Sequence, residues 1–135
     1  MKRHLTTTAM ISAATYILCA VPADAHHSFA MFDPGKTVTL SGTVKEFQWV
    51  NPHVLISVVV NDASKPQPVV WSIEATSPGI LRRQGWNKDS LKPGDKVEAI
   101  GNPLRDGSPG AGFVSLKILD TGKVLGLKLP TPPKE

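Results

Sequence analysis

The fold is decided by two adjoining segments near the middle of the chain, residues 47–53 (FQWVNPH) and residues 54–60 (VLISVVV). The second segment is rich in β-branched and aliphatic residues, is too short to span a membrane and has no helical spacing. It therefore predicts a buried β-strand. Asn51-Pro52 predicts a corner before this strand, because proline fixes its own φ and restricts the preceding residue to extended geometry. We expect Trp49, Asn51 and Pro52 to form a structural corner between two strands, with the tryptophan largely buried.

The segment before the corner has the pattern of one long strand with an irregularity. Its apolar residues lie at even positions from Val38 to Val44, whereas Phe47 and Trp49 lie at odd positions. Side chains in a strand alternate between the two faces of the sheet, so this change of phase indicates a bulge or a sharp coil. We place it around Gly42.

A short helix is predicted downstream of the corner. Ser77 is a good N-cap, Pro78 suits the first turn and Gly85 ends the helix. So short a helix is unstable alone, so we expect apolar side chains to dock it on the rest of the domain. These are Ile80, Leu81 and Trp86.

The remaining segments complete a small barrel. Strands are expected at residues 37–49, 53–60, 69–75, 96–102, 113–119 and 124–129, with the helix between the third and the fourth. This order predicts a mainly β fold, namely a five- to six-stranded OB-type barrel with one short helix between strands three and four. A six-stranded sandwich is the alternative.

The N-terminal segment has the features of a secretory signal peptide. Lys2 and Arg3 precede an apolar stretch at residues 9–21, and Ala23-Asp24-Ala25 supplies the small residues of a cleavage site. We therefore expect residues 1–25 to be removed, no transmembrane segment to remain, and the mature protein to reside in the periplasm or to be secreted.

Composition limits what the mature chain can be. About 110 residues remain after cleavage, enough for one domain. We expect a single β-barrel domain at residues 26–130, with an N-terminal arm at 26–36 and a solvated tail at 131–135. The only cysteine, Cys19, lies in the leader, so a hydrophobic core must hold the mature domain together. The formal net charge of +4 falls to about +3 on cleavage and forms no basic block, which is weak support for nucleic-acid binding.

Several short motifs resemble those of a family of small secreted bacterial proteins that is known as a domain of unknown function. They are residues 26–29 (HHSF), 32–33 (FD), 49–53 (WVNPH), 71–74 (WSIE), 77–86 (SPGILRRQGW), 91–95 (LKPGD) and 105–107 (RDG). The resemblance extends over essentially the whole mature chain. It implies export and a small β-rich domain, and it supplies no activity.

The histidines are the candidate metal ligands. Cleavage after Ala25 would give His26 a free α-amine beside its imidazole, and His27 can bind together with the amine and the intervening amide. Nitrogen ligands of this kind favour Cu(II). We expect His53 to complete the site if the arm folds over the corner, with Glu74 or Asp33 orienting an imidazole. The predicted function is a periplasmic copper-binding or metal-delivery module.

Other functions have less support in the residue pattern. No nucleophile–base pair or carboxylate pair occurs at a readable spacing, so we expect no catalytic residues and no enzyme activity. We expect no nucleic-acid partner, because export separates the chain from one. Trp49, Trp71 and Trp86 are assigned to the core and to helix docking rather than to a ligand platform. The alternative is a metal-independent OB-type module that binds another envelope protein or a small ligand. The oligomeric state is open.

Overall fold

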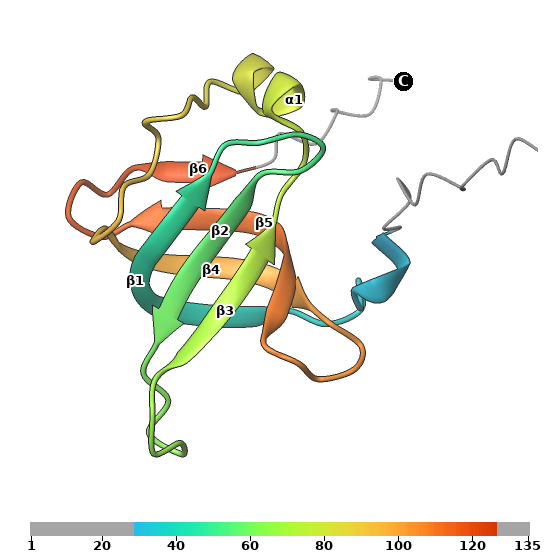
Figure 1. The fold of residues 1–135 in the computed structure, drawn as a ribbon, viewed down its shortest axis with the longest axis vertical. Helices are drawn as coiled ribbons and strands as arrows, with labels where there is room; N and C mark the ends of the chain where they lie inside the picture. The colour runs from blue at the N-terminus through green and yellow to red at the C-terminus, as the bar shows by residue number, and fades with distance from the viewer. Residues whose placement is uncertain (1–28, 127–135) are drawn as a thin grey trace, which may run out of the picture.

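The long strand before the corner organises the barrel. In the computed structural model, which describes residues 29–126, β1 (Val38–Gln48) pairs antiparallel with β2 (Leu55–Val60) along one edge and with β4 (Lys96–Pro103) along the other. β3 (Val69–Glu74) pairs antiparallel with β2 and parallel with the start of β5 (Gly110–Ile118). Because β5 also pairs with β4, the sheet closes on itself (Figure 1).

The predicted fold class is confirmed. The described residues are mainly β and form a closed five-stranded barrel, with one extra strand, β6 (Val124–Gly126), added to β5. One short helix, α1 (Pro78–Arg83), lies between β3 and β4. A coiled first strand shared by both halves of the sheet is the arrangement of an OB-type barrel, so the sandwich alternative is wrong.

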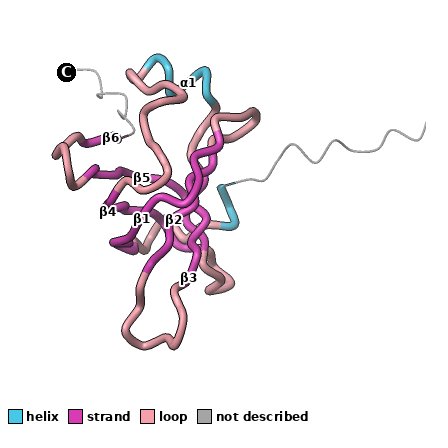
Figure 2. Tube along the Cα trace, turned by 60° about the vertical axis from the view of Figure 1, so that its left-hand side comes forward, coloured by secondary structure: helices cyan, strands magenta, loops and turns pink. Residues whose placement is uncertain are grey.

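Alternation along the strands fills the barrel interior. Val54, Ile56 and Val58 point inward and are fully buried, and Ile73 and Ala75 face them from β3 and its extension. Helix α1 and the predicted corner lie at one end of the barrel, and the loop at residues 61–68 projects from the other end (Figures 1 and 2).

The helix begins and ends where the sequence predicts. The side chain of Ser77 accepts a hydrogen bond from the Ile80 N–H at 3.4 Å, and Gly85 has a φ of 91°, which favours glycine. Leu81 and Trp86 are buried and dock the helix, with the Trp86 ring edge-on to Phe113 at 5.2 Å. Ile80 does not contribute as expected, because its side chain is exposed.

The irregularity in β1 is present, but it lies beyond Gly42. The pairing with β2 shifts between Val44 and Glu46, so Lys45 is the extra residue, and the shift carries Phe47 to the core-facing side. Gly42 serves another purpose, because a Cβ there would collide with the carbonyl oxygen of Val59.

The strand boundaries differ from the predicted ones mainly in β5. This strand begins at Gly110, three residues earlier than expected, because its first residues pair with β3. It also has a bulge of its own, since Ile100 pairs with Ser115 and Gly101 with Phe113, which leaves Val114 unmatched. Within β6 the description ends at Gly126, so residues 127–129 of the predicted strand lie outside the described residues.

The apolar residues Phe29, Met31 and Phe32 predict that the N-terminal arm lies against the barrel, and the described part of the arm does so. It opens with a short 3-10 helix, η1 (Phe29–Met31), drawn in blue beside the strands in Figure 1. The predicted leader (1–25), His26, His27 and the tail (131–135) lie outside the described residues. Among residues 29–126, no helix is long and apolar enough to cross a membrane.

Candidate functional site

Strand register brings His53 and Glu74 together. Leu55 pairs with Glu74, and the ladder continues past β2, where the Ala75 N–H donates to the Val54 carbonyl at 2.8 Å. His53 is therefore diagonal to Glu74 on the outer face of the barrel, a spacing that long side chains can bridge. The expected proximity of these two residues is confirmed.

The pair is in close contact. Nδ1 of His53 lies 2.6 Å from Oε1 of Glu74, which sets a carboxylate oxygen directly against one nitrogen of the imidazole ring. The two side chains are 26% and 20% exposed, so solvent or a ligand can still reach the ring. The second ring nitrogen, Nε2, is not used in this contact.

The N-terminal arm reaches this histidine. The ring of Phe29 lies 6.4 Å from the ring of His53, measured between centroids, and is tilted by 53°. The arm is fixed downstream of Phe29, because the Arg105 N–H donates to the Met31 carbonyl at 3.0 Å and the Asp33 N–H donates to the Pro103 carbonyl at 2.9 Å. The N-terminal arm therefore joins the outside of the barrel beside His53.

Four residues form a row across the outer face of the barrel beneath the arm, which we call the outer row. Glu74 pairs with Gly112 of β5, and Gly112 pairs with Asn102 of β4, so His53, Glu74, Gly112 and Asn102 follow one another across neighbouring strands. Phe32 lies on Gly112, where a Cβ would come within 3.1 Å of the phenyl ring.

The predicted corner is correct in position, but Trp49 is not largely buried. Asn51 and Pro52 are exposed and joined by a cis peptide bond, and Trp49 is half-buried at the margin of the core. Its ring lies 5.8 Å from Phe47, and the guanidinium carbon of Arg82 lies 6.0 Å from its centroid. Trp49 thus bridges the barrel end and α1, where packing covers only part of its surface.

Asp33 is engaged away from His53. Its carboxylate accepts a hydrogen bond from the Gly35 N–H at 3.1 Å and pairs with Lys36 at 3.4 Å and with Arg105 at 3.9 Å. Of the two residues proposed to orient an imidazole, only Glu74 contacts His53. Residues 29–126 contain no group of three His, Cys, Asp or Glu side chains placed to hold a metal ion.

Sequence reasoning missed Gly112 and Asn102 as parts of this face, and it predicted that Phe29 lies against the barrel without identifying what it contacts. The one available signal was Gly110-Ala111-Gly112, since small residues in a strand often mark the close approach of another segment. That signal does not say which segment approaches.

Comparison with protein families identifies the family of the chain. A family model matches residues 14–113, three quarters of the sequence and all of the outer row. The chain belongs to the family of unknown function DUF6152. For this DUF6152 member, comparison with curated proteins gave no match. Among solved structures, it is similar to the mitochondrial single-stranded DNA binding protein Rim1 of S. cerevisiae. The identity is 10% and the TM-score 0.48, with 62% of this chain and 93% of that chain covered.

Proposed function

We propose that the protein is an exported Cu(II)-binding module that holds the metal through His26, His27 and His53 and delivers it without catalysis of its own. The observation that carries this proposal is the 2.6 Å contact between Nδ1 of His53 and Glu74, at the point where the N-terminal arm reaches the barrel.

The contact suits a metal-binding imidazole. Histidines that bind metals almost always donate their other ring N–H to a carboxylate or carbonyl, which fixes the tautomer and makes the binding nitrogen more basic. The Glu74 carboxylate is close enough to Nδ1 of His53 to take that role in the proposed site, which would leave Nε2 as the nitrogen that binds the ion.

Chain length supports the other two ligands. An extended chain advances at most about 3.6 Å per residue, so the Cα of His27 is within about 7 Å of the Phe29 Cα and that of His26 within about 11 Å. Because Phe29 contacts His53, both histidines are within reach of the same ion. Cleavage after Ala25 would add the α-amine of His26, and this nitrogen-rich set favours Cu(II) over other divalent ions.

The experiment is a Cu(II) titration of the mature protein, comparing Glu74→Gln with Glu98→Gln. Glu98 is an exposed carboxylate on β4 and matches the substitution without touching His53. Loss of the orienting carboxylate should weaken copper binding roughly 10- to 100-fold in Glu74→Gln, while Glu98→Gln behaves as wild type.

His53→Ala completes the test. We expect this substitution to weaken copper binding more than Glu74→Gln does. We also expect the domain to stay folded, because the His53 side chain lies on the outer face of the barrel. Equal copper binding by wild type, Glu74→Gln and His53→Ala would contradict the proposal and favour a metal-independent binding module. An unfolded His53→Ala would show that the histidine is structural.

A further inference from the structure

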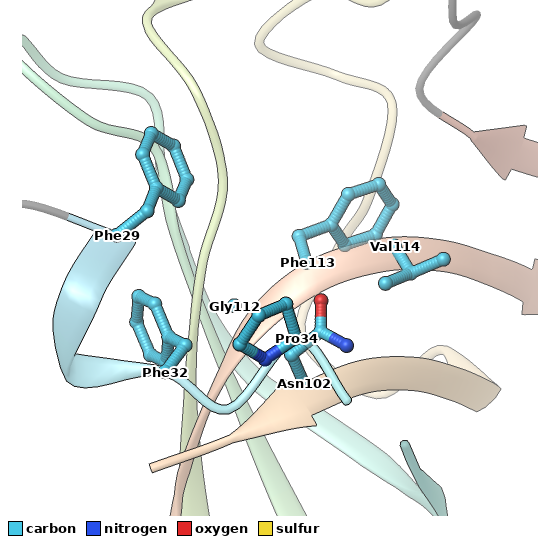
Figure 3. A pocket seen from close by; sticks show the side chains of 7 residues that line it. All are labelled: Phe29, Phe32, Pro34, Asn102, Gly112, Phe113 and Val114. Carbon is cyan, nitrogen blue, oxygen red and sulfur yellow. The ribbon is translucent and has the colours of Figure 1, made fainter. Parts of the chain in front are cut away.

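A cavity of about 340 Å³ lies beside the outer row, between the arm and the β4–β5 pair. Phe29 and Phe32 line it from the arm, Asn102 from β4, and Gly112, Phe113 and Val114 from β5 (Figure 3). Its volume is within the range of small-molecule sites, which begins at about 300 Å³.

The sequence builds this cavity by two local features. Gly112 has no side chain, so the Phe32 ring lies directly on the β5 backbone and forms one wall. Val114 is the unmatched residue of the β5 bulge, and bulges redirect side chains. The arm is held by backbone hydrogen bonds from Asp33 to Pro103 and from Arg105 to Met31, so this wall is fixed to the barrel.

Of the described residues that line this cavity, Asn102 is the one with a polar side chain. The Nδ2 of Asn102 donates to the Lys36 carbonyl at 2.8 Å, and this bond sets which way the amide points. Figure 3 shows the Asn102 oxygen turned toward Phe113. Within residues 29–126, no group donates a hydrogen bond to that oxygen. It is therefore a free acceptor at the wall of the cavity.

We propose that this cavity binds a small, flat, neutral aromatic molecule with one hydrogen-bond donor, which the Asn102 Oδ1 accepts. Three phenyl rings line the site, and aromatic rings pair favourably edge-to-face or offset. Among residues 29–126, no charged side chain lines it, so a charged ligand would lose hydration without compensation. Phe29 also contacts His53, so a bound molecule would touch the ring that lies against the candidate metal ligand.

The test titrates the full mature chain, freed of metal with a chelator, with indole as the probe. Chemical shifts of the Gly112 amide and the Asn102 side-chain amide report binding. Indene has the shape of indole without the N–H, so we expect it to bind about tenfold more weakly. Absence of metal keeps the result independent of copper binding.

Two tryptophan substitutions provide the matched comparison. Val114→Trp fills the cavity and should weaken indole binding at least tenfold. Val124→Trp, on β6 and outside the cavity, should leave it unchanged, since Val124 is 64% exposed. The indole–indene comparison needs no variant, so the proposal stays testable even if Val114→Trp does not fold. No shift at Gly112 and Asn102 with millimolar indole, equal binding of indene, or equal binding by the two variants would overturn it.

Discussion

At the scale of single residues, the pairing of His53 with Glu74 was predictable, because alternation in residues 53–60 and 69–75 fixes which faces meet. The degree of burial of Trp49 was not predictable, because the sequence does not show how closely α1 covers the corner. The half-buried Trp49 stacks on Arg82, whereas Trp86 is enclosed. The two tryptophans should therefore differ in their contribution to stability.

We predict that Trp49→Ala lowers the free energy of unfolding by about 2 kcal/mol and that Trp86→Ala lowers it by about 3–5 kcal/mol. The difference arises because Trp86 is only 3% exposed and packs against Phe113. Urea unfolding followed by circular dichroism measures both. A loss for Trp49→Ala equal to that for Trp86→Ala would mean that the corner is part of the main core.

Asp106 offers a test of local geometry in the β4–β5 loop. The Ser108 hydroxyl and backbone N–H donate to its carboxylate and lower the pKa of Asp106 below its ordinary value of 3.8. A lowered folded-state pKa contributes stability above the ordinary value, and this contribution is lost as the pH falls through the folded value. Ser108→Ala should raise the Asp106 pKa toward 3.8 in an NMR titration. An unchanged pKa would show that the hydroxyl does not matter.

At the scale of elements, the strands, the helix caps and the existence of a bulge in β1 were all predictable. Their patterns depend on neighbours along the chain. Three features were not predictable, because they depend on how strands distant in the sequence meet. They are the position of the bulge in β1, the bulge at Val114 and the parallel pairing of β3 with β5. Gly42 illustrates the difference: it was read as a bulge, and its role is to let β1 approach Val59 closely.

Gly42→Ala should therefore lower the free energy of unfolding by about 2 kcal/mol, since the new Cβ collides with backbone that cannot move freely. Gly79→Ala is the matched control, because a Cβ at that helical position meets nothing nearer than 4.0 Å and alanine favours helix. Thermal unfolding of the two variants compares them. Similar transition temperatures for the two variants would contradict this prediction, because they would mean that β1 and β2 can move apart to accommodate the new Cβ.

At the scale of the whole molecule, the barrel class follows from element order, whereas the place of the N-terminal arm does not. The apolar residues of the arm predicted that it would lie on the barrel, but only the fold shows that it meets His53 and Gly112. His26 and His27 were singled out by their place after a predicted cleavage site, so the candidate site depends on processing.

We predict that the protein is exported and that its mature form begins at His26. Ala23-Asp24-Ala25 supplies the cleavage signal, and intact-mass measurement of material recovered from the periplasm or the medium reads the N-terminus directly. A retained leader or a cut at another residue would remove the α-amine from the proposed ligand set.

The most direct test of the proposed copper site is Cu(II) titration, with copper spectra, of the native mature protein and of a form that begins Met-His26. We predict that the added residue markedly weakens copper binding and changes the spectrum, because the α-amine is moved away from the His26 imidazole. We also predict that His53→Ala weakens copper binding in the native form. Equal copper binding at micromolar affinity or weaker by both forms, unaffected by His53→Ala, would contradict the proposed site.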